Sequence, residues 1–152
     1  MRKTNQKKIQ NWQKMNKIAL FAGSFDPFTK GHQDIVNRAL SSVADEVGIA
    51  IGINYEKKGM FSAEERQKAI RAVYQGDSRV RVETYEGLTT DYAKQIGASF
   101  LLRSVRSVKD FEFERDMAEV NRRLTGIETV LLLCDPQLAC ISSSVVRELL
   151  SY

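Results

Sequence analysis

The chain has 152 residues, which fits one domain because domains usually contain about 50 to 250 residues. A hydrophobic share of 43% and a charged share of 28% are typical of soluble globular proteins and argue against disordered, collagen-like and coiled-coil classes. Two cysteines, Cys134 and Cys140, cannot form a disulfide framework or a four-ligand zinc site, so we expect a cytoplasmic protein. The formal charge of +4 favours an anionic partner.

That positive charge is concentrated in residues 1–16, which contain five basic residues and no acidic residue. Residues 17–152 then hold 18 basic and 19 acidic residues, a net charge of −1. We interpret residues 1–16 as a basic flexible leader, solvated or a start-site artefact, with a nucleic-acid-binding arm as the alternative. The sequence contains no apolar run typical of a signal peptide or a membrane span. We therefore expect no nucleic acid and no membrane as partners.

Residues 17–152 form one domain in which short apolar runs alternate with helical patterns. We expect strands at 18–22, 47–53, 80–83, 99–102 and 129–133, and helices at 31–42, from 62, at 89–96, at 108–124 and from 143. The helix at 108–124 has an apolar stripe formed by Phe113, Met117, Val120 and Leu124. This order predicts an α/β fold, a parallel sheet with helices on both faces and right-handed crossovers. Ligands of such sheets bind beyond the carboxyl ends of the strands.

The segment after the first predicted strand, residues 23–32 (GSFDPFTKGH), has the features of a phosphate-binding loop. Gly23 permits close approach of the backbone, and Ser24 supplies a hydroxyl group. His32, the one histidine of the chain, falls in the first turn of the next helix, where N–H groups and the helix dipole favour a phosphate. The same dipole disfavours imidazolium, so we expect a neutral imidazole that donates a hydrogen bond. A structural helix cap is the alternative.

Basic and hydroxyl side chains follow three of the other predicted strands. Lys57 and Lys58 follow the second strand, as solvated loop lysines or as contacts to a ligand phosphate. Arg103 and Arg106 follow the fourth, where two guanidinium groups can hold separate phosphates through bidentate hydrogen bonds. The serines at 142–144 open the last helix, where they can cap it, bind phosphates, or do both.

Four ordered motifs resemble those of the nucleotidyltransferase superfamily and, within it, the pantetheine-phosphate adenylyltransferase family. They are GSFDPxTxGH at 23–32, KKxMFSxEER at 57–66, RSVR at 103–106 leading to DFEFE at 110–114, and ISSS at 141–144. The resemblance extends over about residues 17–151. It implies a Rossmann-like, doubly wound, five-stranded parallel sheet of nucleotidyltransferase type. The implied reaction is adenylyl transfer from ATP to 4′-phosphopantetheine, giving dephospho-coenzyme A and pyrophosphate.

The same resemblance implies the site residues. His32 would stabilise the transition state, and Ser24 would contact both substrates. Lys57, Thr89 and Arg103 would bind 4′-phosphopantetheine. The further implied ATP contacts are Phe25, Ser104, Val105, Arg106, Glu114, Leu138, Ala139, Cys140, Ile141, Ser142, Ser143 and Ser144. Mg²⁺ is the expected cofactor, bound to the triphosphate without a dedicated protein site, and the expected assembly is a homohexamer.

Two other functions are alternatives to this hypothesis. A sister nucleotidyltransferase could act on another phosphorylated acceptor, such as nicotinamide mononucleotide, but Thr29 in place of histidine and the run from Arg103 to Glu114 argue against it. A non-catalytic nucleotide- or nucleic-acid-binding module is the second alternative. The presence of His32 together with both arginines argues against that module.

Overall fold

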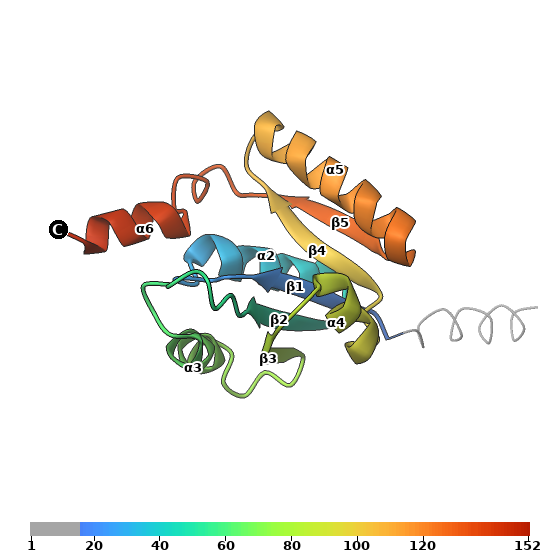
Figure 1. The fold of residues 1–152 in the computed structure, drawn as a ribbon, viewed down its shortest axis with the longest axis horizontal. Coiled ribbons are helices and arrows are strands. Elements are labelled where there is room, and N and C mark those ends of the chain that lie inside the picture. Colours follow the sequence, from blue (N-terminus) through green and yellow to red (C-terminus); the bar gives the residue numbers. More distant parts are fainter. Residues whose placement is uncertain (1–15) are drawn as a thin grey trace, which may run out of the picture.

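The computed structural model describes residues 16–152, so the predicted leader lies outside the described residues except for its last position. Strands and helices alternate along this part of the chain (Figure 1). The strands are β1 (Ile18–Gly23), β2 (Glu46–Gly52), β3 (Val80–Tyr85), β4 (Phe100–Val105) and β5 (Glu128–Leu133). The helices are α2 (Lys30–Ser42), α3 (Ala63–Val73), α4 (Thr89–Ile96), α5 (Val108–Thr125) and α6 (Ser143–Leu150).

All neighbouring strands are parallel, in the order β3-β2-β1-β4-β5. The prediction of a doubly wound five-stranded parallel sheet is therefore confirmed. The strand order reverses between β1 and β4, and a crevice forms at the carboxyl end of such a switch point. The loop after β1 and the first residues after β4 meet there.

Helices cover both faces of the sheet, which explains the apolar runs of its central strands β1 and β2. On one face, α2 and α3 pack over a core that contains Phe21, Ile35, Ile49, Ile70 and Leu102. On the other face, α4 covers a smaller core, and α5 packs against β4 and β5. Helix α6 has no buried residue and extends away from the sheet toward the C-terminus (Figure 1).

Polar side chains begin the helices where the sequence places them. Ser62 accepts a hydrogen bond from the Glu65 backbone N–H, and the Glu65 carboxylate accepts one from the Ser62 N–H, so the two residues form a capping box at the start of α3. The Ser142 hydroxyl caps α6 by accepting a hydrogen bond from the Val145 backbone N–H. Gly126 ends α5 with φ +75°, a left-handed conformation that glycine adopts without strain.

The apolar stripe predicted for the helix at 108–124 is largely exposed in α5. Phe113 and Leu124 are 63% and 75% exposed, although they belong to the predicted apolar stripe. The reason is that α5 turns small and polar residues toward the sheet, with Glu114 buried and Ala118 and Asn121 half-buried. The apolar stripe of α5 is therefore largely exposed, although Phe113 and Met117 line a hollow between the helix and the sheet. Within residues 16–152, no helix combines the length and apolar character needed to span a membrane.

Candidate active site

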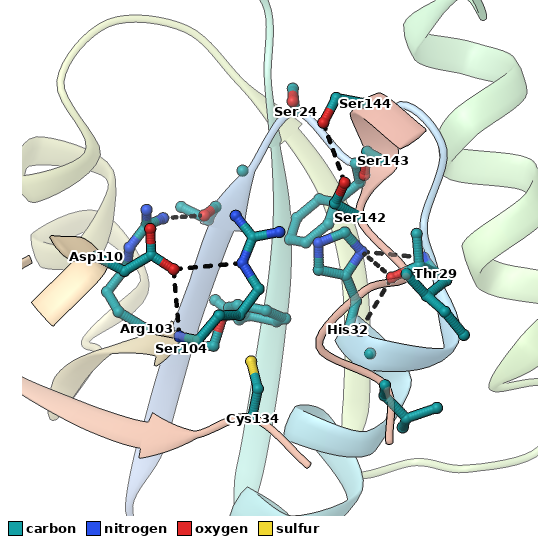
Figure 2. A pocket seen from close by; sticks show the side chains of 18 of the residues that line it. Ser24, Thr29, His32, Arg103, Ser104, Asp110, Cys134, Ser142, Ser143 and Ser144 are labelled. Atoms are coloured by element: carbon teal, nitrogen blue, oxygen red, sulfur yellow. Dashed lines mark hydrogen bonds and ion pairs between the residues drawn. The ribbon is translucent and has the colours of Figure 1, made fainter. Parts of the chain in front are cut away.

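A cavity of about 370 Å³ opens at the switch point between β1 and β4. Figure 2 shows His32, Thr29 and the serines of α6 on one side of it, with Arg103, Ser104 and Asp110 on the other. The predicted site residues that line it are Ser24, Phe25, His32, Arg103, Ser104, Arg106, Glu114, Leu138, Ile141, Ser142, Ser143 and Ser144. Segments far apart in the sequence therefore meet at the edge where ligands of this fold class bind.

The loop after β1 is held from three directions. The Asp26 carboxylate accepts hydrogen bonds from the backbone N–H groups of Met60 and Phe61, at 2.8 and 2.9 Å. Arg66 of α3 donates to the Ser24 carbonyl oxygen at 2.6 Å. The Ser143 hydroxyl of α6 donates to the Pro27 carbonyl oxygen at 2.7 Å. This loop therefore links the segment that carries Lys57 to the serines of α6.

Phe25 has a backbone conformation that is unusual for a residue other than glycine. Its φ is +48°, and its side chain is 4% exposed. A bulky residue in this region is strained and persists where packing fixes it. The Phe25 ring packs edge-on against the His32 ring, with 5.0 Å between centroids. The strained turn therefore supplies an apolar wall for the imidazole.

His32 is both a helix cap and a candidate donor. Its Nδ1 accepts a hydrogen bond from the Thr29 backbone N–H at 3.0 Å, and the Thr29 hydroxyl accepts one from the His32 N–H at 3.4 Å. An Nδ1 atom that accepts from an N–H group has no proton, so a neutral imidazole must carry its proton on Nε2. The helix-cap role therefore uses Nδ1, and the role of hydrogen-bond donor uses Nε2.

The environment of His32 keeps it neutral. Burial, together with the positive charges of Arg106 and Arg103, lowers its pKa from 6.5 to about 4. The rings of Phe25 and Phe28 supply much of this burial, with centroids 5.0 and 5.4 Å from the imidazole. The pKa supports the expectation of a neutral donor at this position.

Because His32 is the one histidine of the chain, its protonation can be followed without assignment. The unfolded chain, with an ordinary pKa near 6.5, binds more protons than the folded chain between that pH and about 4. The contribution of His32 to the free energy of unfolding is therefore fully present above pH 6.5 and is lost as the pH decreases toward 4. In ¹⁵N-resolved NMR spectra we expect a neutral Nε2–H tautomer that does not titrate between pH 8 and pH 5.5. A midpoint near 6.5, or an Nδ1–H tautomer, would contradict the geometry.

Arg103 lies within β4 rather than after it. The pairing of β4 with β5 continues to Val105 and Leu133, so the predicted strand end at residue 102 was too early. The Arg103 Nε and Nη2 atoms donate to the two carboxylate oxygens of Glu114 at 2.9 and 2.8 Å. A third donor, Nη1, reaches the Ala22 carbonyl oxygen at 2.9 Å. This bonding raises the pKa of Arg103, so its guanidinium stays charged.

Arg106 follows β4 directly and is exposed toward the cavity. The Asp110 carboxylate accepts from the Arg106 Nε and backbone N–H groups at 3.3 and 3.2 Å. Asp110 also lines the cavity, although it was not predicted as a site residue. Cys134 lies nearby, and burial raises the pKa of its thiol, so we interpret it as an unreactive wall residue.

Arg147 of α6 is a further wall residue that the sequence analysis missed. It lies one helical turn after Ser143, and its Nη1 donates to the Asp26 carbonyl oxygen at 2.6 Å. It lines both the main cavity and a second groove, of about 240 Å³, that contains Lys57, Lys58 and Arg66. A spacing of four residues from a predicted phosphate-binding serine was the signal that could have identified it.

Thr89 lies in a third hollow, of about 270 Å³, between the sheet and α5. Its hydroxyl group hydrogen bonds to the Tyr85 hydroxyl at 2.8 Å. Arg103 and Glu114 line both this hollow and the main cavity. Lys57 and Thr89 therefore do not line the main cavity, but each lies in a hollow that shares residues with it.

Three predicted ATP contacts are not among the residues that line the main cavity. Val105 is buried in the sheet at 5% exposure and does not reach the cavity. Ala139 is half-buried and Cys140 is exposed, and both belong to the turn before α6. Only the flanking residues Leu138 and Ile141 of that turn line the cavity.

Comparisons with known proteins agree with this geometry. A family model described as cytidylyltransferase-like matches residues 20–149. A phosphopantetheine adenylyltransferase of Porphyromonas gingivalis is 56% identical over 135 residues, which cover 89% of this chain and 88% of that protein. Another, of Bacteroides fragilis, is 51% identical over 134 residues, covering 88% and 89%. The chain belongs to the phosphopantetheine adenylyltransferase family.

Solved structures with lower identity share the fold. A NadR protein in complex with NR is 16% identical with a TM-score of 0.58, covering 88% of this chain and 40% of that one. A lipopolysaccharide core biosynthesis protein of Thermoplasma volcanium is 15% identical with a TM-score of 0.55, covering 78% and 96%. At such identities the likeness concerns the fold alone. The family resemblance found in the sequence motifs is confirmed by the closer relatives.

Proposed function

We propose that this enzyme transfers the adenylyl group of ATP to 4′-phosphopantetheine, forming dephospho-coenzyme A and pyrophosphate. The observation that carries this proposal is the cavity at the β1–β4 switch point, where a neutral imidazole faces Arg103 and Arg106. The relatives at 56% and 51% identity are named for this activity, and the alignments cover 88% and 89% of their lengths.

In this reaction an oxygen of the acceptor's phosphate attacks the α-phosphorus of ATP. The bond from the α-phosphorus to the bridging oxygen breaks, and pyrophosphate leaves with the electron pair. The attacking phosphate is already anionic, so the enzyme needs neither a base nor a covalent intermediate. Catalysis then consists of positioning and of stabilising negative charge. His32 suits the second task, because Nδ1 is held by the cap and Nε2–H is the donor that remains.

The main cavity, the hollow that contains Thr89 and the groove that contains Lys57 offer a binding site for each part of the substrates. ATP would occupy the main cavity, with its phosphates near Arg106 and the serines of α6. The phosphate of the acceptor would lie near Arg103, between this cavity and the hollow that contains Thr89. The pantetheine arm would extend along that hollow. Lys57 would reach the phosphates from the groove beside Ser24.

We propose Mg²⁺ as the cofactor, held by oxygens of the triphosphate and by water rather than by a protein cage. The carboxylates that line the main cavity fit this arrangement, because Glu114 is paired with Arg103 and Asp110 with Arg106. When bound, the ion would neutralise negative charge on the triphosphate. The serine hydroxyls and Arg106 would then orient the nucleotide from the protein side.

We also propose a homohexamer that works in the cytoplasm. The exposed apolar stripe of α5, which includes Phe113, Val120 and Leu124, supports assembly. Monomeric soluble proteins seldom expose a large apolar patch, so a second subunit would cover this stripe. Helix α6 adds Leu149 and Leu150, which are 69% and 60% exposed. Both cysteines are unpaired thiols, which fits a reducing compartment.

Pyrophosphate release tests this function. The enzyme is incubated with ATP, Mg²⁺ and one acceptor at a time, chosen from 4′-phosphopantetheine, pantetheine without its phosphate, and nicotinamide mononucleotide. We expect release with 4′-phosphopantetheine and none with pantetheine, because the acceptor's phosphate is the nucleophile. Turnover of nicotinamide mononucleotide without turnover of 4′-phosphopantetheine would overturn the assignment.

A further inference from the structure

Arg66 ends the second sequence motif and has no role in the proposed function. It lies in the first turn of α3 and lines the groove that contains Lys57. Its Nε atom donates to the carbonyl oxygens of Phe61 and Ser62 at 3.1 and 3.3 Å. Its Nη1 atom donates to the Ser24 carbonyl oxygen at 2.6 Å. One side chain therefore joins the start of α3 to the loop after β1.

Within residues 16–152, the guanidinium group of Arg66 bonds to backbone oxygens and forms no ion pair. Arg103 and Arg106, in contrast, each pair with a carboxylate of α5. Arg66 is half-buried, so its donors must be satisfied by the protein or by a ligand. Bonds from one rigid group to two segments fix those segments relative to each other. The contacts of Arg66 therefore define the path of the backbone rather than neutralise an acidic side chain.

The carbonyl groups on both sides of Phe25 are each held by an arginine. Arg66 donates to the Ser24 oxygen at 2.6 Å. Arg147 donates to the Asp26 oxygen at 2.6 Å. Phe25 has the strained φ of +48°, a conformation that persists only where its surroundings fix it. The two arginines therefore restrain from outside the same turn that the packing of the Phe25 ring restrains from the core.

The direction of the Ser24 carbonyl group determines the direction of the next N–H group. In a planar trans peptide, the C=O of one residue and the N–H of the next point in opposite directions. The Ser24 oxygen points to Arg66 in the groove, so the Phe25 N–H points away from it, on the side of the main cavity. Within residues 16–152 this N–H has no hydrogen-bond acceptor. An unpaired backbone donor at such a wall is suited to an anionic oxygen.

We propose that Arg66 is a positioning residue, which orients the Ser24–Phe25 peptide so that its N–H donates to a substrate phosphate during adenylyl transfer. In this role the guanidinium group acts through one peptide group of the loop rather than on the substrates. A donor that is fixed before the reaction stabilises developing charge without having to reorganise. This inference rests on the proposed function, because it gives Arg66 a part in that reaction.

The test is the Arg66→Met variant, which keeps an unbranched side chain but removes all three hydrogen bonds. We expect kcat to fall about ten-fold, less than when an oxyanion donor is removed outright, because the Phe25 N–H is present but no longer held. The KM values for ATP and 4′-phosphopantetheine should change by less than about two-fold, as for an interaction made in the transition state. A rise in either KM with unchanged kcat would make Arg66 a direct substrate contact and overturn the inference.

Arg71→Met is the matched control. Arg71 lies on the same helix and also donates to a backbone carbonyl oxygen, that of Val82 in β3, at 2.9 Å. It lines neither the main cavity nor the groove. Arg71→Met should therefore leave kcat unchanged, even where thermal unfolding shows as large a loss of stability as in Arg66→Met. Equal losses of kcat in the two variants would make Arg66 an anchor of α3 only.

The amide signal of Phe25 gives a readout that a loss of stability alone would not move. In ¹⁵N-resolved NMR spectra of the wild type, ATP with Mg²⁺ should shift this signal and slow its hydrogen exchange. At the same nucleotide saturation, Arg66→Met should lose most of both responses, whereas Arg71→Met should keep them. A wild-type response of Phe25 in Arg66→Met would refute the proposed orientation of the peptide.

A second variant keeps the test decisive if Arg66→Met does not fold. Arg66→Lys keeps the charge, but an ammonium group lacks the fork that reaches both segments at once, so a fall in kcat of about three-fold is expected. Wild-type kcat in Arg66→Lys would then contradict the inference. Turnover of the wild type decides the proposed function separately. An active wild type with full kcat in Arg66→Met refutes only the role of Arg66, and a wild type that binds ATP without turnover refutes the proposed function.

Discussion

Replacing His32 with asparagine should reduce kcat by about 100-fold or more while leaving the fold intact, by analogy with the loss of one donor from an oxyanion hole. The Oδ1 atom of asparagine lies where Nδ1 lies in histidine, so it can still accept from the Thr29 N–H and keep the cap. The donor provided by Nε2–H is lost. Steady-state kinetics together with a thermal unfolding curve measure both effects.

Two companion variants separate the cap from the donor. His32→Gln places an amide N–H near the position of Nε2 and should retain more activity than His32→Asn. His32→Ala loses both groups, so kcat should fall as in His32→Asn, and the unfolding free energy should also decrease by about 1 kcal/mol through loss of the cap. Wild-type kcat in His32→Asn would show that the imidazole serves only as a cap.

Replacing Asp26 with alanine should impair both stability and use of the acceptor. Asp26 is 6% exposed, and its carboxylate accepts from the backbone N–H groups of Met60 and Phe61. Their loss should lower the unfolding free energy by about 2 to 4 kcal/mol, because two donors are left without acceptors. The segment that carries Lys57 would lose its anchor, so we expect the KM for 4′-phosphopantetheine to rise about ten-fold, as when a charge-assisted contact is lost. Chemical denaturation and initial-rate kinetics measure the two effects.

Gly59 offers an independent route to the same anchor. A Cβ atom there would lie 2.9 Å from the Asp26 Oδ2 atom, so Gly59→Ala must displace the carboxylate or the segment. It should therefore reproduce the rise in KM. Asp45→Ala is the matched control, because Asp45 also accepts a backbone N–H bond, from Lys17 before β1, far along the strand from the cavity. If Asp45→Ala raised the acceptor KM as much as Asp26→Ala, the anchor would not be the cause.

The alternation of apolar runs and helical patterns was enough to predict the fold. The central strands β1 and β2 are largely buried, so their sequences are mostly apolar and stand out from the amphipathic helices. The edge strand β3 instead alternates buried Val82 with exposed Arg81 and Glu83. Strand ends were less predictable. Arg103 and Ser104 are polar residues inside β4, and polar residues usually signal that a strand has ended. They lie in the strand because the pairing with β5 continues past them.

The site was predictable where its residues follow strands and was missed where it depends on tertiary contacts. The position of His32 after β1 suggested both a cap and a donor, and the structure assigns the cap to Nδ1. The pairing of Arg103 with Glu114 joins residues eleven positions apart on a strand and a helix, so their spacing alone did not predict it. The anchoring of the segment after β2 by Asp26 spans more than thirty residues and depends on the fold as a whole.

The product of the reaction tests the central claim most directly. Purified enzyme is incubated with ATP, Mg²⁺ and 4′-phosphopantetheine, and the mixture is examined by mass spectrometry alongside the pyrophosphate assay. The proposed function predicts dephospho-coenzyme A and pyrophosphate in equal amounts, and far less of both with His32→Asn. ATP consumed without formation of dephospho-coenzyme A, or a product formed equally well by His32→Asn, would contradict it.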